Sequence, residues 1–217
     1  MSDNSELDES FFNSNSLKTL NLQNVKFSSR LKFDLPNLRE LTLSNVNCSS
    51  LNKSICNSLN LENLSMWKVQ FKKLPDEISN LVKLKKITVY NKLETIENIQ
   101  FPDSLEEIDF RANKLEVIPD SILKLSNIKS IDLSDNKFSK FPIIENNNLT
   151  KLSLRDTPFG IFKSNVEKLK NKCKNSEILG GRNGFYVEEK EEKGIYLPQT
   201  KKYYYPDKIE GTTQMRW

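Results

Sequence analysis

Residues 105–122 read LEEIDFRANKLEVIPDSI, and this stretch contains the pattern that decides the fold. Its first half is an instance of LxxLxL, in which Leu105, Ile108 and Phe110 occupy the apolar positions. The same pattern opens at Leu17, Leu38, Leu61, Leu84, Leu105, Ile128 and Leu149, with spacings of 21, 23, 23, 21, 23 and 21 residues. Self-similarity at this period predicts a repeat architecture, because each short unit buries its apolar side only by stacking on a neighbour.

Each unit begins with a strand that buries one side. The two apolar residues of each strand alternate with polar ones, which is the period of a strand with a single buried face. These pairs are Leu20/Leu22, Leu41/Leu43, Leu64/Met66, Ile87/Val89, Ile108/Phe110, Ile131/Leu133 and Leu152/Leu154.

Further apolar anchors follow, as in Leu115–Ile122 with its Leu-x-x-Ile-Pro-x-x-Ile order, where Pro119 suits a segment that donates no ladder hydrogen bond. From Leu17 to Phe162 the chain resembles the intracellular leucine-rich repeat family, LxxLxLxxNxLxxLPxxI. The resemblance implies an α/β leucine-rich repeat solenoid, or horseshoe. Its parallel concave sheet has about seven repeats, and its convex side is short helical or irregular.

The family's asparagine, which ties neighbouring turns together, is present only as Asn113 and Asn136. Val25, Val46, Val69, Lys92 and Thr157 replace it in the other repeats. We therefore expect the early repeats to be held by packing more than by an asparagine ladder.

We expect four segments in one domain. Residues 1–16 form an N-terminal cap, residues 17–162 the repeat domain, residues 163–179 a basic capping helix, and residues 180–217 an extended aromatic and charged tail. The run Gly180-Gly181-Arg-Asn-Gly184 is expected to break regular structure and act as a hinge.

Composition excludes several kinds of chemistry. The 217 residues contain no histidine, which removes histidine-based nucleophile systems and most zinc or iron sites. There is no phosphate-binding GxxxxGK[ST] loop. We therefore predict a protein that is not an enzyme and holds no cofactor or metal.

The three cysteines suggest a reducing compartment. Cys48, Cys56 and Cys173 are odd in number and lack metal-ligand spacing, and Cys48 is expected to be buried. The acidic N-terminus does not look like a secretory signal, and no run approaches the ~18 apolar residues of a membrane helix. We predict a soluble, cytoplasmic protein without a membrane contact, with the nucleus as the alternative location.

Two acidic residues raise the question of catalysis. Strands lie ~4.8 Å apart, so Asp109 and Asp132 are expected to face each other like a paired-carboxylate site. Acid–base chemistry would need one of them to hold a raised pKa in an enclosed pocket. The sheet is open, and Arg111 and Arg155 lie near enough to neutralise both, so we favour binding over catalysis.

A recognition site is predicted on one concave row. Tryptophan, tyrosine and arginine dominate interface hot spots, because they bury much area and still offer a polar end. The candidate residues on this face are Trp67, Tyr90, Arg111, Arg155, Asp109, Asp132 and Lys86. The alternative is that Trp67 packs under a flanking loop or under the protein's own tail.

These features predict a docking subunit, scaffold or regulator, monomeric by itself, that binds a protein in a larger intracellular assembly. The tail is expected to add a contact through Tyr196, Lys201, Lys202, Tyr203, Tyr204, Tyr205 and Trp217, or to fold back on the solenoid. The alternative is a factor associated with a ribosome or other ribonucleoprotein, which contacts RNA through Lys163–Lys174 and the tail. Resemblance to family members that regulate phosphatases or GTPases leaves that role open as well.

Overall fold

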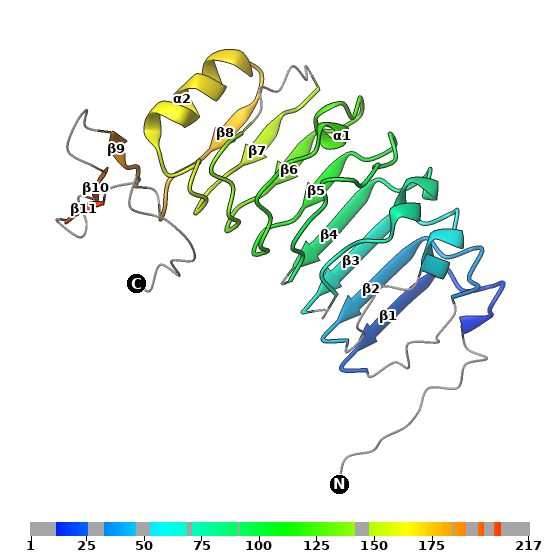
Figure 1. Cartoon of the computed structure of the whole chain (residues 1–217). Coiled ribbons are helices and arrows are strands. Elements are labelled where there is room, and N and C mark those ends of the chain that lie inside the picture. Colours follow the sequence, from blue (N-terminus) through cyan, green and yellow to red (C-terminus); the bar gives the residue numbers. More distant parts are fainter. Residues whose placement is uncertain are drawn as a thin grey trace, which may run out of the picture.

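The computed structural model describes residues 12–25, 33–46, 53–68, 71–90, 92–141, 148–183, 185–189, 195–197 and 202–204. Its main feature is one curved parallel sheet, in which the strands follow one another in chain order (Figure 1). The strands are β1 (Thr19–Gln23), β2 (Glu40–Ser44), β3 (Asn63–Trp67), β4 (Lys86–Tyr90), β5 (Glu107–Asp109), β6 (Ser130–Asp132), β7 (Lys151–Ser153) and β8 (Glu177–Leu179). The leucine-rich repeat solenoid predicted from the period is therefore confirmed.

The register of the sheet follows the repeat spacing. Leu41 of β2 pairs with Leu64 of β3, and Leu64 pairs with Ile87 of β4, so equivalent repeat positions lie side by side. This alignment arises because a shift by one residue would turn every apolar side chain toward the concave surface. Polar residues between the buried ones consequently form continuous rows across the strands.

The sheet has eight strands in the described residues, where about seven were expected. We predicted a helix over residues 163–179, but α2 covers only Lys163–Lys172 and is followed by β8. Strand β8 forms because Ile178 pairs with Leu152 of β7 and is buried. Gly180 and Gly181 then continue this eighth turn and are buried, whereas Gly184, the last residue of the expected hinge, lies outside the described residues.

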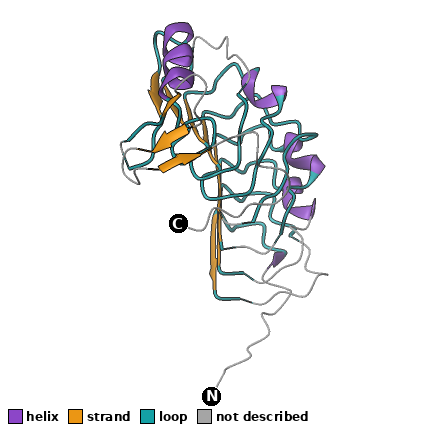
Figure 2. Cartoon of the chain, turned by 60° about the vertical axis from the view of Figure 1, so that its left-hand side comes forward, coloured by secondary structure: helices purple, strands orange, loops and turns teal. Residues whose placement is uncertain are grey.

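The convex side consists of short turns and helices. The 3-10 helices η2 (Lys53–Asn57) and η3 (Asp76–Asn80) and the α-helix α1 (Asp120–Leu123) lie opposite the sheet (Figure 2). Each places one isoleucine in the core, namely Ile55, Ile78 and Ile122. Pro75 and Pro119 precede η3 and α1 with extended backbone, which matches the proline's role in the motif.

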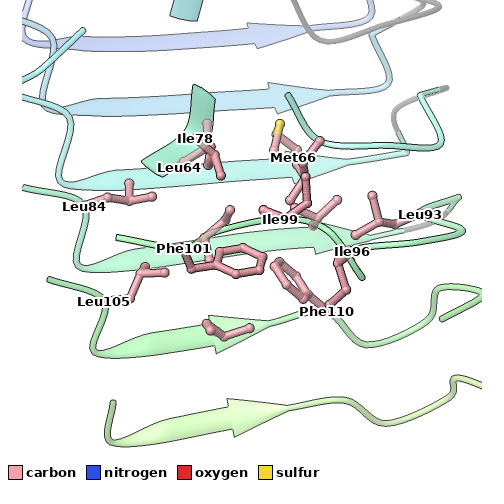
Figure 3. Close-up of a cluster of buried hydrophobic side chains, with 14 of the residues drawn as sticks. Leu64, Met66, Ile78, Leu84, Leu93, Ile96, Ile99, Phe101, Leu105 and Phe110 are labelled. Carbon is pink, nitrogen blue, oxygen red and sulfur yellow. The ribbon is translucent and has the colours of Figure 1, made fainter. Parts of the chain in front are cut away.

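The core lies between these two layers. Side chains from the strands meet side chains from the convex segments (Figure 3). The labelled residues, all buried, are Leu64, Met66, Ile78, Leu84, Leu93, Ile96, Ile99, Phe101, Leu105 and Phe110. Burying one such side chain contributes roughly 1.5–3 kcal/mol, so stacking of repeats is the main source of stability.

The asparagine position behaves as the sequence predicts. Asn113 donates from Nδ2 to the carbonyls of Val89 (2.7 Å) and Phe110 (2.9 Å), and accepts from the Leu93 amide (3.0 Å). Its bonds therefore join neighbouring repeats. In the seventh repeat Thr157 takes over part of this role, donating to the Leu154 carbonyl (2.7 Å). Val46 is buried at the equivalent place in an early repeat and contributes packing instead.

The two ends of the solenoid are covered differently. At the N-terminal end Phe12 is fully buried and packs edge-on against Phe33, with ring centroids 5.3 Å apart. Most of the predicted cap lies outside the described residues, as does Cys48. At the other end α2 buries Val166 and Leu169.

The tail contains a second, small sheet. Its strands β9 (Glu188–Glu189), β10 (Ile195–Leu197) and β11 (Lys202–Tyr204) are antiparallel. The tail begins by pairing with the solenoid, since the Val187 amide donates to the Ile161 carbonyl (2.8 Å).

Candidate functional site

The candidate site lies where β3, β4 and β5 meet on the concave face. In β3 the buried residues Leu64 and Met66 alternate with outward ones, and Trp67 ends the strand on the outer side. The register pairs Trp67 with Tyr90 of β4 on one side and with Ser44 of β2 on the other. Neither aromatic residue belongs to the buried core.

The rings of Trp67 and Tyr90 are stacked. Their centroids are 6.2 Å apart, and the planes differ by 13°. Trp67 is 44% exposed, which makes it an exposed aromatic surface next to a second ring. Within the described part of the chain, Tyr90 is the ring that packs against Trp67.

Tyr90 is held in place by a hydrogen-bonded ion pair. Its hydroxyl donates to Asp109 Oδ2 (2.5 Å) and accepts from Arg111 Nε (2.6 Å). Arg111 also donates to Asp109 Oδ2 from Nη2 (2.8 Å), and its guanidinium carbon lies 5.0 Å from the centre of the Tyr90 ring. Burial and the hydrogen bond to Asp109 raise the pKa of Tyr90 to about 12, so the phenol stays protonated at neutral pH.

The two candidate carboxylates are neighbours in register but have different partners. Asp109 of β5 pairs with Asp132 of β6 along the backbone. Asp132 accepts from the amide (3.0 Å) and the hydroxyl (2.6 Å) of Ser134, whereas Asp109 binds Arg111 and Tyr90. This arrangement is that of two separately bound carboxylates, and it differs from a pair that shares one proton.

The two remaining predicted residues, Lys86 and Arg155, lie on the same face outside this cluster. Lys86 forms an ion pair with Glu107 (2.7 Å). Arg155 follows β7, two strands beyond β5, with Ser134 at the intervening row position. No contact in the described residues joins Arg155 to Trp67, Tyr90 or Arg111. The structure therefore brings together three members of the predicted row and places the fourth apart from them.

The basic helix and the tail are described to different extents. The five lysines of residues 163–174 are all exposed, and Lys163 pairs with Glu167 at 3.9 Å. Tyr196 lies in β10, and Lys202, Tyr203 and Tyr204 lie in β11. Lys201, Tyr205 and Trp217 lie outside the described residues.

Sequence reasoning missed the hydroxyl partner of Asp132. Ser134 donates to that carboxylate, and its hydroxyl oxygen lies 2.7 Å from that of Ser153, a buried residue of β7. A signal was available, because residues two apart in a strand point to the same face. The same spacing places Arg111 beside Asp109.

Three further observations concern the described residues as a whole. Across the described ranges, no three histidine, cysteine, aspartate or glutamate side chains gather where they could bind a metal ion. Burial, followed by the charge of Glu77, raises the pKa of Cys56 to about 12, so this thiol is not a reactive one. None of the helices in those ranges has the length and apolarity required to span a bilayer.

Comparison with known proteins begins with a negative result, since no protein-family model matches the chain. The probable serine/threonine-protein kinase pats1 of Dictyostelium discoideum is 31% identical over 179 residues, or 70% of this chain. The flightless-1 homolog of Caenorhabditis elegans is 30% identical over 42% of the chain. Leucine-rich repeat-containing G-protein coupled receptor 5 of Rattus norvegicus is 32% identical over 54%. The matched regions are only 6%, 7% and 13% of these relatives' own lengths.

Solved structures show the same fold. A leucine-rich repeat protein of Leptospira interrogans superimposes with a TM-score of 0.60 at 22% identity, covering 79% of this chain and 50% of that one. The TLR13–ssRNA13 complex gives a TM-score of 0.62 at 19% identity, covering 81% of this chain and 26% of that one. With its 21- to 23-residue period, its parallel sheet and these similarities, the chain belongs to the leucine-rich repeat proteins.

Proposed function

We propose that the chain is a non-catalytic interaction module that binds a protein partner through its concave face. The observation that carries this proposal is the exposed indole of Trp67, stacked on Tyr90 at 6.2 Å beside the Arg111–Asp109 ion pair. Leucine-rich repeat folds typically serve as protein-interaction scaffolds, which supports the same conclusion. The proposed setting is a larger intracellular assembly.

The geometry favours binding because the site is already ordered. Immobilising one flexible side chain on association costs about 0.5–1.5 kcal/mol. Tyr90 and Arg111 avoid most of this cost, since four hydrogen bonds between the side chains of Tyr90, Arg111 and Asp109 already hold them. Trp67 rests on this ordered base, so binding energy at its exposed surface is not spent on arranging it.

The tail is proposed to supply a second contact. Two linked contacts raise the apparent affinity through effective concentration, so neither has to be strong. The tyrosine-containing strands β10 and β11 follow the solenoid and β9 in the chain, so the tail can supply this contact without a separate protein.

A second candidate function is RNA contact through α2. The observation in its favour is that Lys168, Lys170 and Lys172 are exposed on one helix, with Glu167 as its acid. Lysine contacts to phosphate weaken steeply with added salt, whereas a contact centred on Trp67 depends on salt only weakly. Salt dependence therefore separates the two functions.

The test is affinity purification of the full chain from native cells, comparing the unchanged protein with the double variant Trp67→Ala/Tyr90→Ala. We expect the specific protein partner to be lost from the double variant while the unfolding temperature changes little, because neither ring is in the core. The matched control is Leu59→Ala/Val82→Ala, which removes two exposed apolar side chains, 52% and 64% exposed, from outside the concave rows.

Two results would contradict the proposal. One is retention of the same partner by the Trp67/Tyr90 variant. The other is loss of capture after ribonuclease treatment or moderate salt, which would favour the RNA function.

A further inference from the structure

The stack of Trp67, Tyr90 and Arg111 has no further described ring on the β2 side of Trp67. The row that contains it runs Gln23, Ser44, Trp67, Tyr90, Arg111 across β1 to β5. Tyr90 has a neighbour on both sides, the indole of Trp67 from β3 and the guanidinium of Arg111, which lies two residues after β5. Among the described residues, Trp67 has Tyr90 on the β4 side and the short side chain of Ser44 as its row neighbour on the β2 side.

Strand spacing makes this end suitable for another flat group. Neighbouring strands lie ~4.8 Å apart, so each strand of the row contributes one level of the stack. The Ser44 side chain is too short to extend as far from the sheet as the rings of Trp67 and Tyr90. We call the position above Ser44, against the β2 side of the indole, the open rung.

The side chains around the open rung are uncharged hydrogen-bonding groups. Ser44 and Gln23 lie in the row itself, and Asn24 and Asn45 follow in the next positions, where Asn45 Nδ2 donates to Asn24 Oδ1 (2.7 Å). Apart from Lys68, which directly follows Trp67, the charged residues described on this face lie elsewhere. Glu40 stands at the opposite end of β2, and the concave charges of β4 to β7 begin at Lys86.

The positive charge of Lys68, the residue next to Trp67 in the chain, argues against a cationic occupant. Lys68 follows Trp67 directly, is exposed, and has a positive φ of 52°. A guanidinium or ammonium group in the open rung would add a second positive charge beside Lys68, and the described residues named around it, Gln23, Asn24, Ser44 and Asn45, include no carboxylate. A neutral ring meets amide and hydroxyl groups that can bind a phenol or indole at its edge.

Building on the proposed function, we propose that the open rung receives a neutral aromatic side chain of the protein partner, stacked on Trp67 above Ser44. Aromatic pairs contribute about 0.5–1.5 kcal/mol beyond the area they bury. Ser44 then determines specificity, because its small size admits the incoming ring.

The first test uses short peptides and the full chain. The variant Trp217→Phe leaves Trp67 as the sole tryptophan of the two in the sequence, so the indole signal in NMR reports on this site. The probes are acetyl-Gly-X-Gly-amide with X as tyrosine, glutamine or arginine, and adenosine monophosphate. We expect the tyrosine peptide to bind about two- to twelvefold more tightly than the glutamine peptide, which is the stacking energy converted to affinity.

The second test fills the rung from within the chain. In Ser44→Tyr the new ring should stack on Trp67, quench its fluorescence and abolish binding of the tyrosine peptide. Gln23→Tyr is the matched control, because its ring starts two strands away and should leave both signals unchanged. The peptide measurement on the native fold remains decisive if Ser44→Tyr does not fold.

Three results would overturn the proposal: equal binding of the tyrosine and glutamine peptides, tighter binding of the arginine peptide, or tighter binding of adenosine monophosphate. These failures are distinguishable from failure of the proposed function. If Trp67→Ala/Tyr90→Ala still loses its partner while the tyrosine peptide does not bind, only the occupant of the open rung is wrong.

Discussion

Replacing Asn136 by alanine should destabilise the protein far more than an ordinary asparagine substitution. Asn136 is 5% exposed and lies in the turn after β6. Its Oδ1 accepts from the Leu115 amide (3.0 Å), and its Nδ2 donates to the carbonyls of Phe110 (2.8 Å) and Leu133 (3.0 Å). It also donates to the Ser134 carbonyl (3.2 Å), which the Ala112 amide bonds as well, so one side chain bonds four backbone groups in this turn and in the repeat before it.

The magnitude follows from the groups left without a partner. The Phe110 carbonyl retains its bond from Asn113 (2.9 Å), so the variant Asn136→Ala orphans the Leu115 amide and the Leu133 carbonyl. Leaving one buried polar group unsatisfied costs about 1–3 kcal/mol. Two groups give a loss of about 2–6 kcal/mol, which is a large part of the 5–15 kcal/mol typical of a folded protein.

The assay is urea unfolding followed by circular dichroism and tryptophan fluorescence. The midpoint should fall while the slope m stays constant, because the substitution changes the native contacts and leaves the exposed area nearly the same. Asn127→Ala is the control, since Asn127 is exposed and donates to the Asp103 carbonyl (2.9 Å) at the surface. Its effect should stay within about 0.5 kcal/mol.

The reasoning would be refuted by a loss below about 0.5 kcal/mol in Asn136→Ala, equal to that of the control. Such a result would mean that water or a shifted turn satisfies both backbone groups. The buried asparagine would then have no more effect than the valines of the early repeats.

Three further outcomes are expected. Gly160→Ala should unfold the C-terminal repeats, because a Cβ at Gly160 would lie 1.8 Å from the Leu154 carbonyl oxygen; calorimetry would show a lower transition temperature, and an unchanged one would contradict the close approach. Tyr90 should make stability fall between pH ~10 and ~12, because burial and Asp109 raise its pKa from 10.0 to about 12, so the folded state retains a proton that the unfolded chain releases. This contribution is complete below pH ~10 and should be missing in Tyr90→Phe, which urea midpoints on both sides of the window would test. Ala112→Gly should raise the urea midpoint by up to about 1 kcal/mol, since Ala112 has φ 54° and pays the cost of a left-handed backbone; a lower midpoint would show that the entropy of glycine outweighs that cost.

Much of the fold was predictable because every repeat places buried apolar residues at the same positions. Leu64, Ile87 and Ile108 occupy the same place in successive units, so stacking them in register is the arrangement that buries all of them. The outward rows follow from that register, which is why Trp67 and Tyr90 could be expected side by side before any coordinates were known.

Strand β8 was missed because its sequence contains too little of the pattern. Glu177–Leu179 has one buried aliphatic residue, Ile178, and follows a helix instead of an LxxLxL opening. It becomes a strand through pairing with β7, where Leu154 donates its amide to the Leu179 carbonyl (2.8 Å). Such a partner is distant in sequence and leaves no local periodicity.

The candidate site was also predicted only in part from the sequence. Sequence spacing predicted that Asp109 and Asp132 are neighbours and that arginines lie close by, and the register confirms the first point. It did not reveal that Asp109 binds the Tyr90 hydroxyl or that Asp132 binds Ser134. The hydrogen-bond partner of each carboxylate depends on side-chain rotamers, and these depend on all the neighbouring side chains in the folded structure.

The order of apolar residues was sufficient to determine the seven patterned repeats of the solenoid, their register and the membership of each concave row, because burial with a regular period favours one stacking. The tertiary structure decided which side chains within a row interact. Trp67, Tyr90 and Arg111 form one stack, and Arg155 lies outside it, because strand spacing, curvature and competing hydrogen bonds act between residues that the sequence separates by 21 to 23 positions.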